Sequence, residues 1–349
     1  MNQTPREVLR KTFTFDFPER LGCCVFALPV FIWDSPEAYE AIMKEFPADC
    51  EWAPAPYEPS SCLSGDPFKK GIYVDEWGCV FTNINPGMIG EVKTPLIPDL
   101  EDLSGLHPPY ELFPKDEAAA IAKVNEFCRN TDKFVFAGCN PRPWERYQFL
   151  RGTENAMMDM ALREENVDKI LAAISDYYVK EIEFWCKTEV DGVAYMDDWG
   201  SQQALLIAPE TWREIFKPIY KKFIDCCHAA GKFVFMHSDG NIEAILPDLV
   251  ELGLDIGNFQ IGCMNLEKIA ACAKGKLTFF GEVDRQQVLT KTPEVARSFV
   301  RKVAKHLYDP AGGIIKELEL GALVKPETAL AALREWDKIV QEQKENAEK

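Results

Sequence analysis

Short apolar runs alternate with amphipathic stretches along most of this chain, and this alternation restricts its possible folds more than any other feature. Five runs of strand length in the second half are separated by segments with helical periodicity. Strands that alternate with helices in this way form a parallel sheet from repeated βα units. The predicted strands are residues 190–196, 232–236, 255–259, 277–281 and 313–320, and the predicted helices are residues 209–230, 242–252, 266–273 and 293–307.

The first half supplies three further strands, at residues 23–29, 49–53 and 133–138, and five plus three makes the eight of a (β/α)8 barrel. We therefore predict one α/β domain, a TIM barrel over residues 1–340, followed by a frayed tail over residues 341–349. A proline- and glycine-rich insertion at 54–112 separates the second and third strands and includes a β-ribbon at 71–84. Long insertions in barrels usually cover the active face, so we expect a lid.

The charge and the cysteines argue against several classes of protein. The chain has 56 acidic and 39 basic residues, for a net charge of −17, and this field repels nucleic acid. The sequence contains no apolar run long enough for a membrane span and no signal-peptide core, so we expect a cytoplasmic protein away from membranes. The 12 cysteines form no CxxC pair, which favours free thiols over a disulfide framework.

Polar residues follow most of the predicted strands. The carboxyl ends of barrel strands open into one shared mouth, so side chains from different strands should meet there. Carboxylates crowded in one mouth repel each other, and a metal, an arginine or shared protons must offset their charge. In strand order, the strand-end residues are Asn140, Arg142 and Arg146; Asp197 and Asp198; His237 and Asp239; Gln260 and Cys263; Glu282, Asp284 and Arg285; and Glu317 and Glu319.

His237 and Asp239 are the residues most indicative of chemistry. They lie two positions apart in an extended segment, so their side chains point to the same side. Together with Asp198 or Glu319 from a neighbouring strand, they form a set of one histidine and two carboxylates. Such a set suits Zn²⁺ with an open coordination position, and harder metals also accept it. Two other interpretations stay open: Asp239 as a helix N-cap, and His237 as a metal-free general acid or base.

The remaining candidates have weaker patterns. Asp197 and Asp198 are adjacent, so only one of them can face the mouth. Arg142 and Arg146 are suited to clamp a carboxylate or phosphate of the substrate, and surface ion pairs account for them equally well. The predicted substrate-binding residues are Arg142, Arg146, Trp77, Trp199, Gln260, Glu282 and Asp284, and Glu317, Glu319 and Cys263 are additional metal-ligand candidates.

Several segments resemble the uroporphyrinogen decarboxylase superfamily in content and order. They are residues 196–225 (MDDWGSQQALLIAPETWREIFKPIYKKFID), 229–255 (AAGKFVFMHSDGNIEAILPDLVELGLD), 281–289 (GEVDRQQVL) and 312–321 (GGIIKELELG). The stretch REVLRKTFTFDFPERL near the N-terminus resembles the opening helix and loop of that superfamily. The resemblance covers nearly the whole chain and implies a (β/α)8 barrel.

The resemblance also implies one of two activities. Decarboxylases of this superfamily work without a metal and use an N-terminal arginine-rich motif, whereas the corresponding stretch here, CCVFALPVFIWDSPEAY, has no arginine. Methyltransferases of the other branch bind zinc through a His-x-Cys element and a later cysteine, and move methyl groups between corrinoid proteins and thiols such as coenzyme M. Here His237 is retained, Asp239 occupies the first cysteine position, and Leu318, between Glu317 and Glu319, occupies the later one.

We therefore expect a metal-assisted methyltransferase near the second branch. Its catalytic residues would be His237 and Asp239 with Asp198 and Asp197. Its cofactors would be Zn²⁺ and a corrinoid carried by a partner protein, and its substrate a small molecule. We expect a monomer or a homodimer. The alternatives are a decarboxylase of a uroporphyrinogen-like polycarboxylate and a barrel without catalysis that binds a corrinoid protein.

Overall fold

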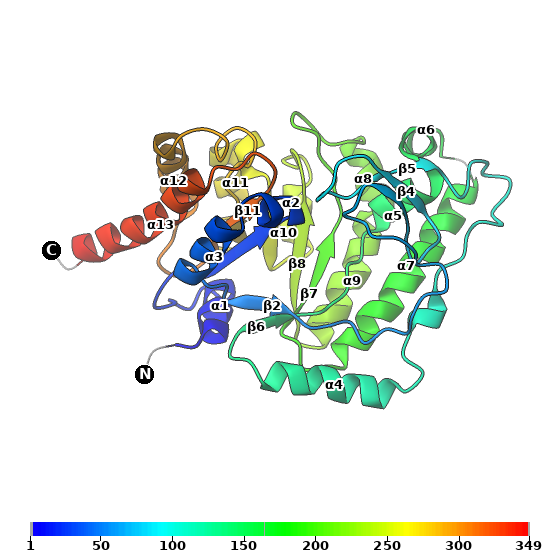
Figure 1. Ribbon diagram of the computed structural model, residues 1–349, viewed down its shortest axis with the longest axis horizontal. Coiled ribbons are helices and arrows are strands. Elements are labelled where there is room, and N and C mark those ends of the chain that lie inside the picture. Colours follow the sequence, from blue (N-terminus) through cyan, green and yellow to red (C-terminus); the bar gives the residue numbers. More distant parts are fainter. Residues whose placement is uncertain (1–2, 164, 348–349) are drawn as a thin grey trace.

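Eight parallel strands form a nearly closed barrel in the computed structural model, which describes residues 3–163 and 165–347 (Figure 1). Neighbouring strands follow the order β1-β11-β10-β9-β8-β7-β6-β2. The bounds are β1 Cys23–Ala27, β2 Cys50–Trp52, β6 Phe134–Phe136, β7 Gly192–Met196, β8 Phe233–Ser238, β9 Ile256–Phe259, β10 Thr278–Gly281 and β11 Ile314–Leu320. All eight predicted strands are present, so the predicted (β/α)8 barrel is confirmed.

The inside of the barrel is filled with aromatic and aliphatic side chains. Phe134 and Phe136 on β6 both point inward, because alternate residues of a strand face the same side. The ring of Phe136 lies 5.5 Å from that of Phe235, which in turn lies 4.9 Å from Phe280 across the barrel. The interior is therefore a packed core, and the polar residues are left to the strand ends.

Helix α1 (Pro5–Phe13) closes the end of the barrel at which the strands begin. The Thr4 hydroxyl accepts the Glu7 N–H while the Glu7 carboxylate accepts the Thr4 N–H, a capping box that starts this helix. Leu9 and Phe13 are buried against the barrel core, and the Phe13 ring lies 5.2 Å from that of Phe134. With this end plugged, only the carboxyl end of the barrel is available for a site.

The remaining helices surround the barrel (Figure 1). Two differ from their predicted bounds. The helix expected at 209–230 divides at Phe216, because Pro218 lacks the N–H that would continue the ladder, and the helix expected at 242–252 begins only at Leu246. The bounds are α2 Pro29–Asp34, α3 Pro36–Glu45, α4 Glu117–Arg129, α5 Pro143–Arg151, α6 Thr153–Leu162, α7 Glu165–Cys186, α8 Pro209–Ile215, α9 Lys217–Ala229, α10 Leu246–Glu251, α11 Leu266–Ala273, α12 Pro293–Leu307 and α13 Pro326–Ala347.

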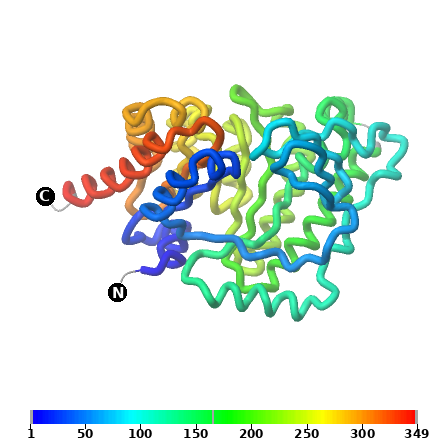
Figure 2. Tube along the Cα trace, in the orientation of Figure 1, coloured from blue at the N-terminus to red at the C-terminus, as the bar shows by residue number. Residues whose placement is uncertain are grey.

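The insertion at 54–112 contains a second, antiparallel sheet in the order β3-β4-β5 (Gly71–Val74, Val80–Asn83 and Glu91–Thr94). The predicted ribbon at 71–84 is the β3–β4 hairpin. Figure 2 shows this segment, blue to cyan, running beside the green helices α5, α6 and α7. Arg146 on α5 is paired with Asp75 of the hairpin at 2.5 Å, and both are buried. The insertion is thus fastened to one flank of the barrel.

The C-terminal boundary at residue 340 does not coincide with the end of a structural element. Helix α13 continues to Ala347, so residues 341–347 extend the helix rather than form a separate tail. Residues 348–349 of the predicted tail lie outside the described residues. Among the helices of the described part of the chain, none has the length and apolar content that a bilayer crossing requires.

The aromatic core predicts a large cost for truncation. Phe235→Ala should lower the free energy of unfolding by about 3–5 kcal/mol, because Phe235 is buried between Phe136 and Phe280 and its loss leaves a cavity. Urea denaturation followed by circular dichroism measures this change. Met158→Ala, at an exposed position on α6, should change stability by less than about 0.5 kcal/mol. Equal effects of the two substitutions would contradict the packing described here.

Candidate metal centre

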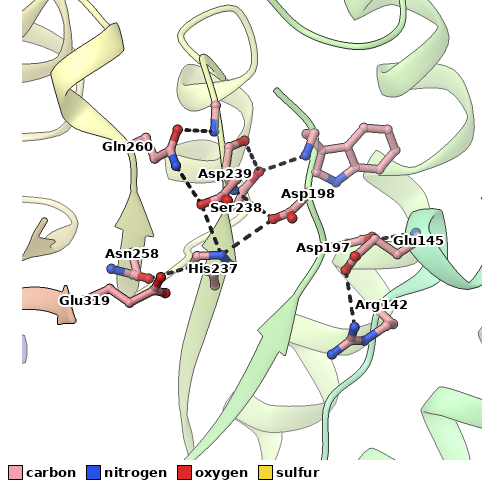
Figure 3. A network of polar contacts seen from close by, with 12 residues as sticks. Arg142, Glu145, Asp197, Asp198, His237, Ser238, Asp239, Asn258, Gln260 and Glu319 are labelled. Atoms are coloured by element: carbon pink, nitrogen blue, oxygen red, sulfur yellow. Dashed lines mark hydrogen bonds and ion pairs between the residues drawn. The ribbon is translucent and has the colours of Figure 1, made fainter. Parts of the chain in front are cut away.

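Three side chains from adjacent strand ends converge at the mouth of the barrel (Figure 3). His237 is the fifth residue of β8, Asp239 follows that strand, and Asp198 follows β7. The His237 Nε2 atom lies 3.5 Å from Asp198 Oδ1 and 3.5 Å from Asp239 Oδ1. One ligand atom from each residue lies within 4.8 Å of the others, a spacing that could hold one metal ion. The structure therefore brings together His237, Asp239 and Asp198, one of the two ligand sets that the sequence left open.

The imidazole of His237 is oriented by an amide behind it. His237 Nδ1 lies 2.5 Å from Asn258 Oδ1, while Asn258 Nδ2 donates to Glu317 Oε2 at 3.1 Å. An amide oxygen only accepts hydrogen bonds, so Nδ1 carries the proton and donates it. In the neutral ring Nε2 then presents a lone pair to the two carboxylates. That arrangement calls for a cation or a proton between them, and an oriented histidine of this kind is the usual support of a metal ligand.

Two glycines allow the loops after β7 and β8 to touch. A Cβ atom on Gly240, whose φ is +77°, would lie 2.1 Å from the Gly200 carbonyl carbon. The Gly200 N–H donates to the Asp239 carbonyl at 3.0 Å, and the Asp239 N–H donates to Asp198 Oδ1 at 2.8 Å. The two aspartates are consequently held by backbone contacts rather than by their own side-chain rotamers alone. Only glycine permits so close an approach.

Asp239 does not cap a helix, which removes one of the two alternatives to a ligand role. The Glu243 N–H at the start of the following turn is capped instead by Asn241 Oδ1 at 3.1 Å. Asp239 Oδ1 accepts from Gln260 Nε2 at 2.9 Å, and Gln260 Oε1 accepts the Gly240 N–H at 3.0 Å. Gln260, a predicted substrate-binding residue, thus positions Asp239.

Arg285 is the principal site residue to which the sequence analysis, which placed it at a strand end, assigned no role. Its guanidinium pairs with Asp239 Oδ2 and, at 2.5 Å, with Glu319 Oε1. Glu319 therefore forms an ion pair and does not join the triad as a ligand. The sequence shows that Arg285 follows the seventh barrel strand, β10. Its contacts with Asp239 after β8 and with Glu319 on β11 depend on the curvature of the barrel. This arginine supplies part of the positive charge that the crowded carboxylates require.

Two deeper carboxyls hold protons. Burial raises the pKa of Glu282 to about 8, and among the described residues neither of its oxygens has a hydrogen-bond partner. Burial, followed by the nearby Glu282 charge, raises the pKa of Glu317 well above its ordinary value. Glu282 is therefore largely neutral at pH 7, and burial that disfavours the charged form makes both groups poor metal ligands. Glu317, predicted as a ligand candidate, instead supports the Asn258 amide.

Asp197 points away from the mouth. It is fully buried and accepts the backbone N–H groups of Trp144 and Glu145 at 2.9 and 2.8 Å, at the start of α5, and the Tyr220 hydroxyl at 2.5 Å. Burial raises its pKa to about 7. The expectation that only one aspartate of the pair faces the mouth is met, and Asp198 is that residue. The assignment of Asp197 as catalytic does not agree with this geometry.

Several other predicted site residues are engaged by contacts within the protein. Trp199 is fully buried, with its ring 4.5 Å from Phe216, and Trp77 is buried beneath the Arg146 guanidinium, so neither presents a face to a ligand at the mouth. Asp284 Oδ1 accepts the N–H groups of the two glutamines that follow Arg285. Burial raises the pKa of the Cys263 thiol to about 11, and its Sγ donates to the Gln260 carbonyl at 3.0 Å, which disfavours a thiolate ligand.

The two predicted arginine clamps are already paired. Arg146 is buried and bonded to Asp75 and, at 3.0 Å, to Glu76. Arg142 Nη1 lies 3.6 Å from Glu145 Oε2, and burial raises the pKa of Glu145 to about 8 while the charge of Arg142 opposes that shift. Glu145 was not predicted, although it lies three residues after Arg142 at the third strand end. The structure thus gives these arginines protein partners.

A (β/α)8 barrel with polar side chains gathered at the carboxyl ends of its strands is the architecture in which barrel enzymes hold their active sites. Residues 77–343 match the family model described as uroporphyrinogen decarboxylase (URO-D), and the chain belongs to that family. No curated protein sequence matches the chain significantly.

Solved structures agree on the architecture. A methyltransferase from Methanosarcina mazei superimposes with a TM-score of 0.69 at 14% identity, covering 97% of this chain and 100% of that one. A GH113 beta-1,4-mannanase has a TM-score of 0.40 at 9% identity, covering 92% of this chain and 99% of its own. The first likeness supports the barrel fold over the whole chain, and the second is too distant to add to it.

The protonated state of Glu282 predicts a pH-dependent stability. The folded pKa lies above the unfolded value, so the folded chain keeps a proton that the unfolded chain releases between about pH 4.5 and 8. The contribution of Glu282 to the free energy of unfolding should therefore fall as pH rises through that window, by up to about 1.4 kcal/mol per pH unit. Glu282→Gln should flatten this dependence in urea titrations at several pH values, whereas Glu126→Gln, on the exposed side of α4, should preserve it.

Proposed function

We propose that this chain is a metal-assisted methyltransferase of the URO-D family, with Zn²⁺ held by His237, Asp239 and Asp198. The observation that carries the proposal is the convergence of these three side chains around a histidine whose lone pair faces two carboxylates. Zn²⁺ binds histidine nitrogen and carboxylate oxygen atoms, and catalytic zinc sites have three protein ligands and one open position. The metal, when bound, would lower the pKa of an acceptor thiol or hydroxyl and so make it nucleophilic.

The surrounding residues fit a metal in this position. Asn258 orients the imidazole, and Gln260 and Arg285 hold the Asp239 carboxylate. Arg285 withdraws charge from Asp239, which weakens it as a ligand and leaves Asp198 as the more available carboxylate. The set contains two oxygens and no thiolate, so it is harder than the His-x-Cys set of the zinc methyltransferases that the sequence resembles. A hard site of this kind favours an oxygen or nitrogen acceptor.

Methyl transfer is supported over decarboxylation by the arginines. A polycarboxylate needs several unpaired guanidinium groups, whereas Arg146 is bonded to Asp75 and Glu76, which leaves Arg142 alone of the two predicted clamps. The fold of the Methanosarcina mazei methyltransferase is a further, weaker support. A corrinoid carried by a partner protein would donate or receive the methyl group. If methylcobalamin is the donor, the methyl group leaves without its bonding electron pair, the acceptor forms the new bond, and the acceptor proton is released.

Turnover tests the reaction directly. Zinc-loaded protein with methylcobalamin and thiol, phenol or amine acceptors should convert the methylcobalamin spectrum to that of the demethylated cob(I)alamin under anaerobic conditions. His237→Ala should abolish this change. Release of CO2 from uroporphyrinogen, with no methyl transfer to any acceptor, would replace the proposal with the decarboxylase alternative. The absence of both activities would favour a binding barrel.

Metal content is the second test. Protein incubated with Zn²⁺ and desalted should hold about one zinc per chain by plasma mass spectrometry, because three ligands converge on one position. His237→Ala and Asp198→Ala should each remove it. His306→Ala, on α12, is the matched control and should retain the zinc. The His306 ring contacts the Lys302 carbonyl and is not a member of the triad. Retention of zinc by His237→Ala would exclude the proposed ligand set.

The amide behind the histidine provides a more selective test. Asn258→Leu keeps the side-chain volume but removes the acceptor for His237 Nδ1, so the ring loses its fixed orientation. Zinc affinity should fall by about 10–100-fold, as for other residues that orient a metal-binding histidine. Competition with a chromophoric chelator measures this affinity. A loss of zinc affinity of similar size in Gln202→Leu, which touches Gln260 but not the triad, would mean that general disturbance of the mouth, rather than ring orientation, is responsible.

A further inference from the structure

A large cavity lies beneath the insertion, beside the candidate metal centre. It encloses about 530 Å³, within the range of small-molecule sites. Its walls come from the insertion, from the residues that follow β6, and from α5 and α7. His237, Asp198 and Asp239 do not line it. The lining residue Arg142 contacts Glu145, which connects the cavity to the surroundings of the metal centre.

Two residues that line this cavity each carry a buried side-chain oxygen with no partner among the described residues. These oxygens are Oε2 of Glu181 and Oδ1 of Asn140. Glu181 is only 5% exposed, so water does not readily solvate its free oxygen. A buried acceptor without a hydrogen bond costs about 1–3 kcal/mol, more when it is charged. Their presence on the wall of one cavity is accounted for by a ligand that donates hydrogen bonds.

Glu181 is held in place from behind. The Tyr57 hydroxyl, which belongs to the insertion, donates to Glu181 Oε1 at 2.7 Å, and the Trp185 indole N–H donates to that hydroxyl at 2.8 Å. The Tyr57 bond uses one carboxylate oxygen, and the other oxygen has no donor among the described residues. Burial raises the pKa of Glu181 to about 7, and an adjacent cation would favour its ionised form.

The remaining walls combine aromatic rings with excess negative charge. The lining has four carboxylates, Glu58, Asp75, Glu76 and Glu181, against two guanidinium groups, those of Arg142 and Arg146. Asp75 and Glu76 occupy the Arg146 guanidinium. Aromatic faces attract cations through the ring quadrupole. The aromatic residues of the lining are Tyr57, Tyr73, Phe81, Phe149, Tyr177 and Tyr178.

We propose that this cavity binds a small organic cation, an ammonium group on a mostly apolar body, with Glu181 Oε2 and Asn140 Oδ1 accepting its N–H hydrogens. The aromatic walls contact the apolar body. The inference goes beyond the proposed function, because it concerns a separate cavity and does not require a metal. Failure of zinc binding or methyl transfer would leave it standing.

Isothermal titration calorimetry of the full chain tests the proposal with two matched probes, phenethylammonium and phenylpropionate. They share a phenyl ring and a two-carbon chain and differ in the sign of the head group. We expect phenethylammonium to bind and phenylpropionate not to bind. Glu181→Gln, which keeps the shape and can still accept from Tyr57, should weaken phenethylammonium binding by about tenfold or more.

Two further variants complete the test. Glu126→Gln is the matched control, because it removes the same charge from an exposed carboxylate on α4 that does not line the cavity, and it should change affinity less than about threefold. Asn140→Leu removes the second free oxygen at similar volume and should weaken binding even if Glu181→Gln does not fold. Tighter binding of phenylpropionate, no binding of either probe, or equal affinity in wild type and Asn140→Leu would overturn the proposal.

Discussion

The parallel register of β7, β8 and β9 is the constraint on which the site depends. His237 lies opposite Met196 on one side and Asn258 on the other. That register puts Asp198, two residues beyond Met196, beside the imidazole, and puts the Asn258 amide behind it. A shift by one residue would turn His237 into the outer layer of the barrel, because successive strand residues face opposite sides. The aromatic core and the plug of α1 stabilise the register and leave the carboxyl end of the barrel for chemistry.

Two of the three means that can balance crowded carboxylates, an arginine and retained protons, are present at the mouth, and the third, a metal, is the one we propose. Arg285 neutralises Asp239 and Glu319, Glu282 and Glu317 retain protons because they are buried, and Asp198 with His237 is left for a cation. The division has a functional consequence. The sequence alone cannot distinguish these acids. Burial favours the protonated form of a carboxyl, whereas a nearby guanidinium favours the charged form, so each acid takes its role as proton carrier, ion-pair partner or proposed ligand from its burial and its neighbouring side chains.

The insertion adds a second chemical environment next to the first. Through Tyr57 it fixes one oxygen of Glu181, and through Asp75 and Glu76 it occupies Arg146, so that the cavity beneath it is acidic and aromatic rather than basic. A substrate cation in that cavity and a metal at the strand ends would lie on either side of Arg142 and Glu145. This arrangement connects the two proposals in space while each remains open to its own test.

The sequence by itself determined the eight strands, the barrel, the hairpin of the insertion and the placement of His237 and Asp239 at one strand end, because residue periodicity and strand-end position are local properties. It left Asp198 and Glu319 as equal candidates for the third member. Only the tertiary structure decided the roles of Arg285, Asp197, Trp199 and the two arginine clamps. Arg285 reaches Asp239 across 46 positions and Arg146 reaches Asp75 across 71, and no local pattern encodes such distances. Whether a polar residue at a strand end contacts a ligand or the protein depends on which distant side chains lie near it in the folded barrel. Barrel closure decides which side chains these are.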